Sequence, residues 1–170
     1  MSSLHAAVLN TFKRMNWAYR KVADREVVEA DFEAHHGKMH IHVQSFGEAH
    51  IASIVATSSA IVPTSHRARA VELIMRVNKD LNIGNFEIEW ESGVVMFRQG
   101  NVFPRHRYDE EVLAGLIHTA VAEMDRLTPF LGELCSTAKE MLPLLNIPDL
   151  LSREDLLPPV PEEEEAAPES

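Results

Sequence analysis

The sequence predicts a mixed α+β protein, with a five-stranded antiparallel sheet and helices gathered mainly on one face. Two observations point to this class. Stretches in which apolar residues recur every three or four positions are interspersed with stretches in which they recur every second position, as in helices and half-buried strands. The strand-like stretches are joined by short turns, which favours antiparallel pairing. The chain has 170 residues, 45% of them hydrophobic, so it can form one domain with a substantial core.

The first half of the chain is predicted to form one helix and three strands. The apolar spacing indicates a helix over about residues 4–16. Alternation then indicates strands at residues 27–35, 39–44 and 50–57. The third strand is fairly apolar on both faces, which suggests a central strand that is covered on both sides.

The second half is predicted to form a helix, two strands and a long final helix, giving the order αβββαββα(α). The helix should run from residue 66 to about 82, and the strands should cover residues 86–91 and 94–99. Asp109 is a good cap for the final helix. Thr128 and Pro129 resemble a fresh cap and a first-turn proline, so the helix is expected to continue to about Met141, either without a break or with a break or kink at these residues.

Charge divides the chain into a nearly neutral body and an acidic tail. The net charge is −10, of which residues 143–170 carry −7 and residues 1–142 carry −3. A body this close to neutral has no field that would attract nucleic acid. No stretch approaches the roughly 20 apolar residues that cross a membrane, so no membrane partner is expected. A single cysteine, Cys135, excludes an internal disulfide framework and favours a cytoplasmic location.

Three segments are expected. Residues 1–142 should form the folded α+β domain, and residues 158–170 a disordered, acidic, proline-rich tail. Between them, residues 143–157 contain pairs of leucines that a disordered linker has no physical reason to carry. Leu150 and Leu151 form one of these pairs. This segment is interpreted as a docking element for its own body, a dimer mate or a separate protein, or else as a frayed continuation of the last helix.

The segment from Arg76 to Glu89, RVNKDLNIGNFEIE, resembles the YbjN-like bacterial sensory-transduction-regulator family. The matching positions within it are Asn78, Leu81, Gly84, Phe86 and Glu87, and the resemblance extends over roughly residues 4–135. The family is similar in fold to type III secretion chaperones, which are homodimeric, non-enzymatic binders of protein segments. The resemblance therefore implies a type III secretion chaperone-like fold, a homodimer, and a chaperone-like or adaptor role toward a protein client.

A protein-binding role requires a surface, and the sequence suggests where to look. The helix at 66–82 or an exposed sheet edge would provide the dimer contact. A hydrophobic groove on the sheet face away from the helices would take the client by helix docking or strand addition. The candidate apolar anchors are Ile54, Trp90 and Phe97. For each of these three residues, the alternative interpretation is an ordinary buried position in the core.

The alternative function is a metal- or small-ligand-binding regulator that uses a histidine-rich sheet face. One allowed hairpin register sets His35 opposite His40 and Glu33 opposite His42, with β-carbons about 5 Å apart. Imidazole and carboxylate groups are common zinc ligands, although a flat face rarely brings four of them into a tetrahedron. A solvated face and a pH-sensitive patch are the other interpretations. No metal is therefore assigned.

Nothing in the sequence indicates catalysis. Glycine-rich phosphate loops, nucleophile elbows and HExxH patterns are absent from it. The nearest base to Cys135 along its helix is Lys139, so a small buried hydrophobe is the better interpretation of this thiol. A non-enzymatic protein without a cofactor is expected.

Overall fold

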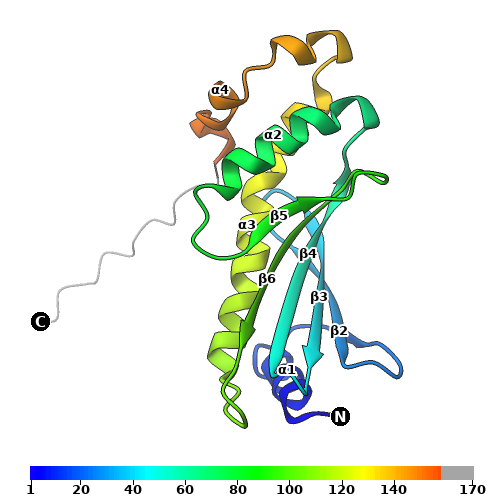
Figure 1. Ribbon diagram of the computed structural model, residues 1–170, viewed down its shortest axis with the longest axis vertical. Helices are drawn as coiled ribbons and strands as arrows, with labels where there is room; N and C mark the ends of the chain where they lie inside the picture. Colours follow the sequence, from blue (N-terminus) through cyan, green and yellow to red (C-terminus); the bar gives the residue numbers. More distant parts are fainter. Residues whose placement is uncertain (158–170) are drawn as a thin grey trace, which may run out of the picture.

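The computed structural model describes residues 1–157, and every strand pair in it is antiparallel. The prediction of a mixed α+β class with an antiparallel sheet is therefore confirmed. The predicted number of strands is wrong, because the sheet has six strands in the order β1-β2-β3-β4-β6-β5 (Figure 1). The expectation of disorder for residues 158–170 lies outside the described residues.

The elements are as follows. The strands are β1 (Arg20–Lys21), β2 (Val27–Glu33), β3 (Lys38–Phe46), β4 (Ile51–Ile61), β5 (Asn85–Ile88) and β6 (Val94–Val102). The α-helices are α1 (Ser3–Arg14), α2 (Arg67–Asn78), α3 (Glu110–Ser136) and α4 (Ile147–Leu151). Three 3₁₀ turns are η1 (Thr64–His66), η2 (Lys139–Leu144) and η3 (Glu154–Leu156).

The strand that the sequence did not reveal is β1, which contains only Arg20 and Lys21. It pairs with Glu29 and Val28 at the outer edge of β2. A two-residue strand is too short to show alternation, so periodicity has no means of detecting it.

The helices leave one face of the sheet open. Helices α1 and α3 pack on the face that carries Val28, Ile41 and Ile54, and all three side chains are fully buried there. Figure 1 shows α3 running along this side, with α2 near β5. Within residues 1–157 the opposite face has no helix against it, and we call it the open face. The expectation that β4 is covered on both sides is therefore wrong.

Helix α3 passes through Thr128 and Pro129 without interruption. Its N-cap is Asp109, as predicted, and the Asp109 carboxylate accepts a hydrogen bond of 2.8 Å from the backbone N–H of Glu111. Thr128 does not start a new helix, because its hydroxyl donates to the carbonyl of Met124 at 2.7 Å within the same helix. Pro129 lies inside the helix, which ends at Ser136. Of the two alternatives for these residues, the structure has the continuous helix. The expected continuation to Met141 is instead a 3₁₀ turn.

The turn between α2 and β5 is built around the Asn78 side chain. Helix α2 ends at this residue, earlier than the predicted position 82. Asn78 Oδ1 accepts from the backbone N–H of Phe86 at 2.7 Å, and Asn78 Nδ2 donates to the Phe86 carbonyl at 3.0 Å. The amide thus takes the place of a neighbouring strand at the edge of β5, and the backbone groups of Phe86 are satisfied.

Gly84 allows the chain to make this turn. Its φ of +74° is disfavoured for residues with a side chain, and a Cβ at this position would collide with the ring of Phe97. Phe97 is fully buried, so the ring has little room to move away. A glycine is therefore required at this point of the turn.

We predict that Asn78→Ala lowers the free energy of unfolding by about 1–3 kcal/mol, because two backbone groups of Phe86 lose their partner. The control is Asn82→Ala, at an exposed position in the same turn, and its effect should stay within about 0.5 kcal/mol. Urea unfolding of both variants measures the difference. Equal stabilities for the two variants would show that the Asn78–Phe86 pair is dispensable.

A second prediction compares two glycines. Gly84→Ala should destabilise the protein by about 1–3 kcal/mol, because the substitution combines backbone strain with a clash against Phe97. Gly115→Ala in α3 should stabilise it by up to about 1 kcal/mol, because a Cβ there meets no atom within 4 Å. Thermal unfolding should therefore give shifts of opposite sign. A neutral Gly84→Ala variant would contradict the prediction.

Candidate functional site

The hairpin between β2 and β3 determines which polar residues meet on the open face. Its observed register sets Glu29 opposite His42, Asp31 opposite His40 and Glu33 opposite Lys38. The register considered for a metal site, with His35 opposite His40 and Glu33 opposite His42, is one of several allowed by the alternation, and it is not the register that forms. The cause is a tight turn, closed by a 2.9 Å hydrogen bond from the backbone N–H of Ala34 to the carbonyl of Gly37.

Asp125 of α3 holds the same turn against the core. This buried carboxylate accepts a 2.6 Å hydrogen bond from the backbone N–H of His36, and its second oxygen lies 3.2 Å from His36 Nδ1. The hairpin is thus tied to the helix layer at its tip. A single acidic residue on the apolar side of a predicted helix is a signal that would have revealed Asp125.

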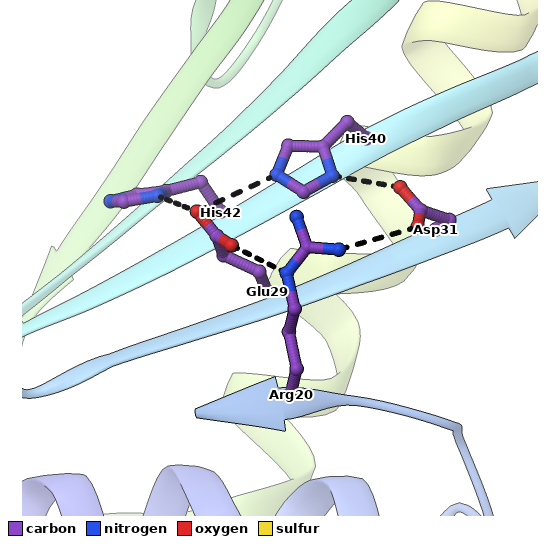
Figure 2. Close-up of polar contacts among 5 residues, drawn as sticks. All are labelled: Arg20, Glu29, Asp31, His40 and His42. Atoms are coloured by element: carbon purple, nitrogen blue, oxygen red, sulfur yellow. Dashed lines mark hydrogen bonds and ion pairs between the residues drawn. The ribbon is translucent and has the colours of Figure 1, made fainter. Parts of the chain in front are cut away.

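Five side chains form a polar cluster on the open face: Arg20, Glu29, Asp31, His40 and His42 (Figure 2). Arg20 Nε donates to Glu29 Oε2 at 2.7 Å, and the Arg20 guanidinium also lies 3.9 Å from Asp31. His40 Nδ1 lies 2.8 Å from Asp31 Oδ1. His42 Nδ1 lies 3.6 Å from Glu29 Oε1. Both carboxylates therefore have partners on two sides.

These contacts keep the two carboxyl groups ionised. The hydrogen bond from Arg20 holds the pKa of Glu29 below its usual value, and the charge of Arg20 acts in the same direction. The hydrogen bond with His40 is the main cause of the lowered pKa of Asp31. Lowered values are opposite to what a carboxyl group needs if it is to act as a general acid near neutral pH. The cluster is therefore suited to holding β1, β2 and β3 together and to presenting fixed charges.

A row of apolar side chains lies beside this cluster at one end of the open face. Phe46, Ile51 and Val102 stand opposite one another on β3, β4 and β6, and we call them the apolar row. Phe46 is 43% exposed and Val102 is 68% exposed. The sequence analysis did not select these residues. The alternation of the three strands shows that the residues share a face, but it does not show which face the helices leave open.

The structure places the three predicted anchor residues in different environments. Ile54 and Phe97 are fully buried on the inner face, so their predicted place in a groove away from the helices is wrong. Trp90 is 55% exposed in the turn after β5. In the C-terminal segment, Leu150 is buried and Leu151 is half-buried.

The four residues considered as metal ligands do not lie close together in the structure. Glu33 lies 3.4 Å from Lys38, and His35 is exposed in the hairpin turn, away from His40 and His42. Across residues 1–157, no three His, Cys, Asp or Glu side chains are grouped as metal ligands would be.

Cys135 is half-buried in α3, and burial raises the pKa of its thiol. The shift disfavours the thiolate, which is the form that would act as a nucleophile.

The structure is thus that of a mixed α+β protein whose antiparallel sheet is covered by helices on one face. The YbjN family model, described as "Putative bacterial sensory transduction regulator", matches residues 5–133, and the chain belongs to this family. No curated protein matches the chain. Among the described residues, no helix has the length and apolar character needed to cross a membrane.

The lowered pKa of Glu29 gives a pH-dependent prediction. A carboxyl group whose pKa is lower in the folded state stabilises the fold above its unfolded pKa of about 4.3, and this stabilisation is lost as the pH falls through the folded value. At pH 7, Glu29→Gln should therefore lower the free energy of unfolding by up to about 1 kcal/mol, and the difference from the unmodified protein should shrink below about pH 4.

The control for this experiment is Glu33→Gln, whose carboxylate is 74% exposed and which should change the stability little at either pH. Urea unfolding at pH 7 and near pH 3.5 provides the comparison. A difference between Glu29→Gln and the unmodified protein that does not change with pH would contradict the assignment.

Proposed function

We propose that this protein is a non-enzymatic regulatory adaptor that binds another protein through the open face of its sheet. The observation that carries the proposal is the exposure of Phe46 and Val102 on either side of Ile51. Apolar side chains that stand together on a surface commonly mark a protein interface. Membership of a family described as sensory transduction regulators supports the regulatory part of the proposal.

The face is a better docking surface than either edge of the sheet. At the β5 edge, Asn78 occupies the backbone groups of Phe86, and Arg67 donates to the carbonyl of Trp90. At the other edge, β1 covers part of β2. Strand addition would have to displace these contacts, whereas docking on the apolar row displaces only water.

The arrangement of charges would orient the partner. The polar cluster lies on the β1–β3 side of the open face, and Arg98 pairs with Glu87 at 3.0 Å on the β5–β6 side. Between them, β4 presents Ser53, Val55 and Thr57, which carry no charge. An uncharged strip with charged borders suits a partner segment with an apolar face and polar flanks.

We further propose that the protein forms a homodimer, acts as a chaperone on the bound segment and is located in the cytoplasm. These three parts of the proposal are based on the family resemblance and on the sequence. Trp90 remains a candidate contact because its side chain is exposed. The apolar row takes the place of Ile54 and Phe97 as the proposed anchor.

The experiment uses two matched valine variants. A partner is captured from a lysate of the source organism, identified and purified, and its affinity for each variant is measured by calorimetry. Val102→Asp places a charge in the apolar row and should weaken binding at least about tenfold, equivalent to about 1.4 kcal/mol. Val112→Asp is the control, because Val112 is 42% exposed on α3, away from the open face.

Light scattering of the unmodified protein should give twice the mass of one chain. Equal affinities for the two variants would overturn the role of the open face. A monomer at micromolar concentration would overturn the proposed homodimer. It would not affect the proposal that the open face binds a partner, which the calorimetry tests separately.

A further inference from the structure

The chain continues beyond the family match as an arm that folds back over α2. We define the arm as residues 139–157, comprising η2, α4 and η3. In Figure 1 it is the orange segment that leaves the end of α3 and returns alongside α2. The arm is therefore an addition to the matched residues 5–133, seated on two of their helices.

Three apolar side chains of the arm are buried, and two of them, Ile147 and Leu150, belong to the main hydrophobic core. Leu142 and Leu150 are 6% exposed, and Ile147 is 1% exposed. Ile147 and Leu150 are three residues apart on α4, so they lie on the same side of this short helix. Asn146 caps the helix by accepting from the backbone N–H of Asp149 at 3.3 Å. The arm therefore binds as a small amphipathic helix does in a groove.

The polar contacts to the arm are made mainly to its backbone. Arg69 of α2 donates to the carbonyls of Leu142 and Pro143, both at 2.9 Å. Just before the arm, His66 Nε2 lies 2.8 Å from the carbonyl of Thr137. Carbonyl groups are common to every residue, so Arg69 could bind a segment of different sequence in the same way.

Ion pairs between side chains contribute little to holding the arm. Arg153 forms a 2.7 Å ion pair with Glu133 of α3, but the two side chains are 41% and 46% exposed, and pairs of this kind contribute little. The arm is therefore held by apolar insertion and by backbone hydrogen bonds. A competing segment could reproduce both.

The surface beneath the arm is not completely filled. A cleft of about 180 Å³ lies between α2, β5 and α3, with Leu81, Phe86 and Phe130 among its lining residues. Leu151 and Leu157 of the arm line the same cleft. A segment with larger apolar side chains at these positions would bury more surface than the arm does.

From these contacts we propose that α2 and the second half of α3 form a second protein-binding groove, which the arm fills in the free protein. Its partner is a short amphipathic helix of another protein, with Ile or Leu at positions i, i+3 and i+4 and polar residues on the outer side. The partner displaces the arm, so the arm is an intramolecular competitor. This groove is separate from the open face and does not depend on the function proposed for it.

The test uses the full chain and a fluorescent peptide with the sequence of the whole arm, residues 139–157, which includes the carbonyls that Arg69 binds. In the variant Ile147→Asp/Leu150→Asp, the arm loses its anchors and the groove becomes accessible. Fluorescence anisotropy should show the peptide binding at least about tenfold more tightly to this variant than to the unmodified chain. The reason is that a tethered arm competes at a high effective concentration, typically in the millimolar range.

Two controls isolate the anchors. Leu144→Asp changes an arm residue that is 74% exposed, and this variant should bind the peptide as weakly as the unmodified chain does. A peptide that carries the same two aspartates should not bind. Adding Arg69→Ala to the double variant should weaken peptide binding several-fold. Adding Arg107→Ala, an exposed residue just before the N-terminus of α3 and far from the arm, should not.

Hydrogen exchange of the unmodified chain gives an independent test. Amides of the arm should exchange faster than the core amides of α3, through an opening that leaves the rest of the fold intact. Exchange of the arm only through global unfolding, or loss of cooperative folding in the double variant, would show that the arm is part of the core and overturn the proposal. A dimer of the unmodified chain that the double substitution dissociates would assign the groove to the arm of a second copy instead.

Discussion

The pairing of Asn78 with Phe86 determines how the rest of the molecule can interact. Helix α2 ends in a side chain that hydrogen-bonds to both backbone groups of one residue in β5, as a further strand would. The sheet is thereby closed at this edge, and α2 is placed beside it. Gly84 makes the geometry possible, because only a residue without a Cβ passes so close to Phe97. The two surfaces proposed for partners are the open face and the outer side of α2.

These two surfaces differ in what covers them. The open face presents Phe46 and Val102 to solvent within residues 1–157, whereas the outer side of α2 lies under the chain's own arm. In the proposed functions, a partner of the open face would bind without rearrangement, whereas a partner of the groove on α2 would have to release the arm. The two proposed binding events therefore differ in energetic cost.

Periodicity predicted the inner residues of the sheet well, because burial of alternate side chains leaves a clear pattern along each strand. It did not predict the hairpin register. The expected and observed pairings differ by an even number of positions, so both keep Val28, Ala30 and Ile41 on the same face. Alternation also does not show which face the helices cover, and for this reason Ile54 and Phe97 were assigned to a groove while the structure places them in the core.

Helix α3 has 27 residues, which corresponds to a rod of about 40 Å, and one hydrogen bond of its regular backbone pattern cannot form. Pro129 has no N–H to donate to the carbonyl of Asp125, four residues earlier, so the rod has lost a backbone hydrogen bond there. The side chain of the same Asp125 is fastened to the tip of the β2–β3 hairpin through His36. The residue whose side chain holds the hairpin tip is thus also the residue whose carbonyl lacks its usual partner within the helix. A change in the helix backbone at this residue would be transmitted to the hairpin tip through the Asp125–His36 contacts.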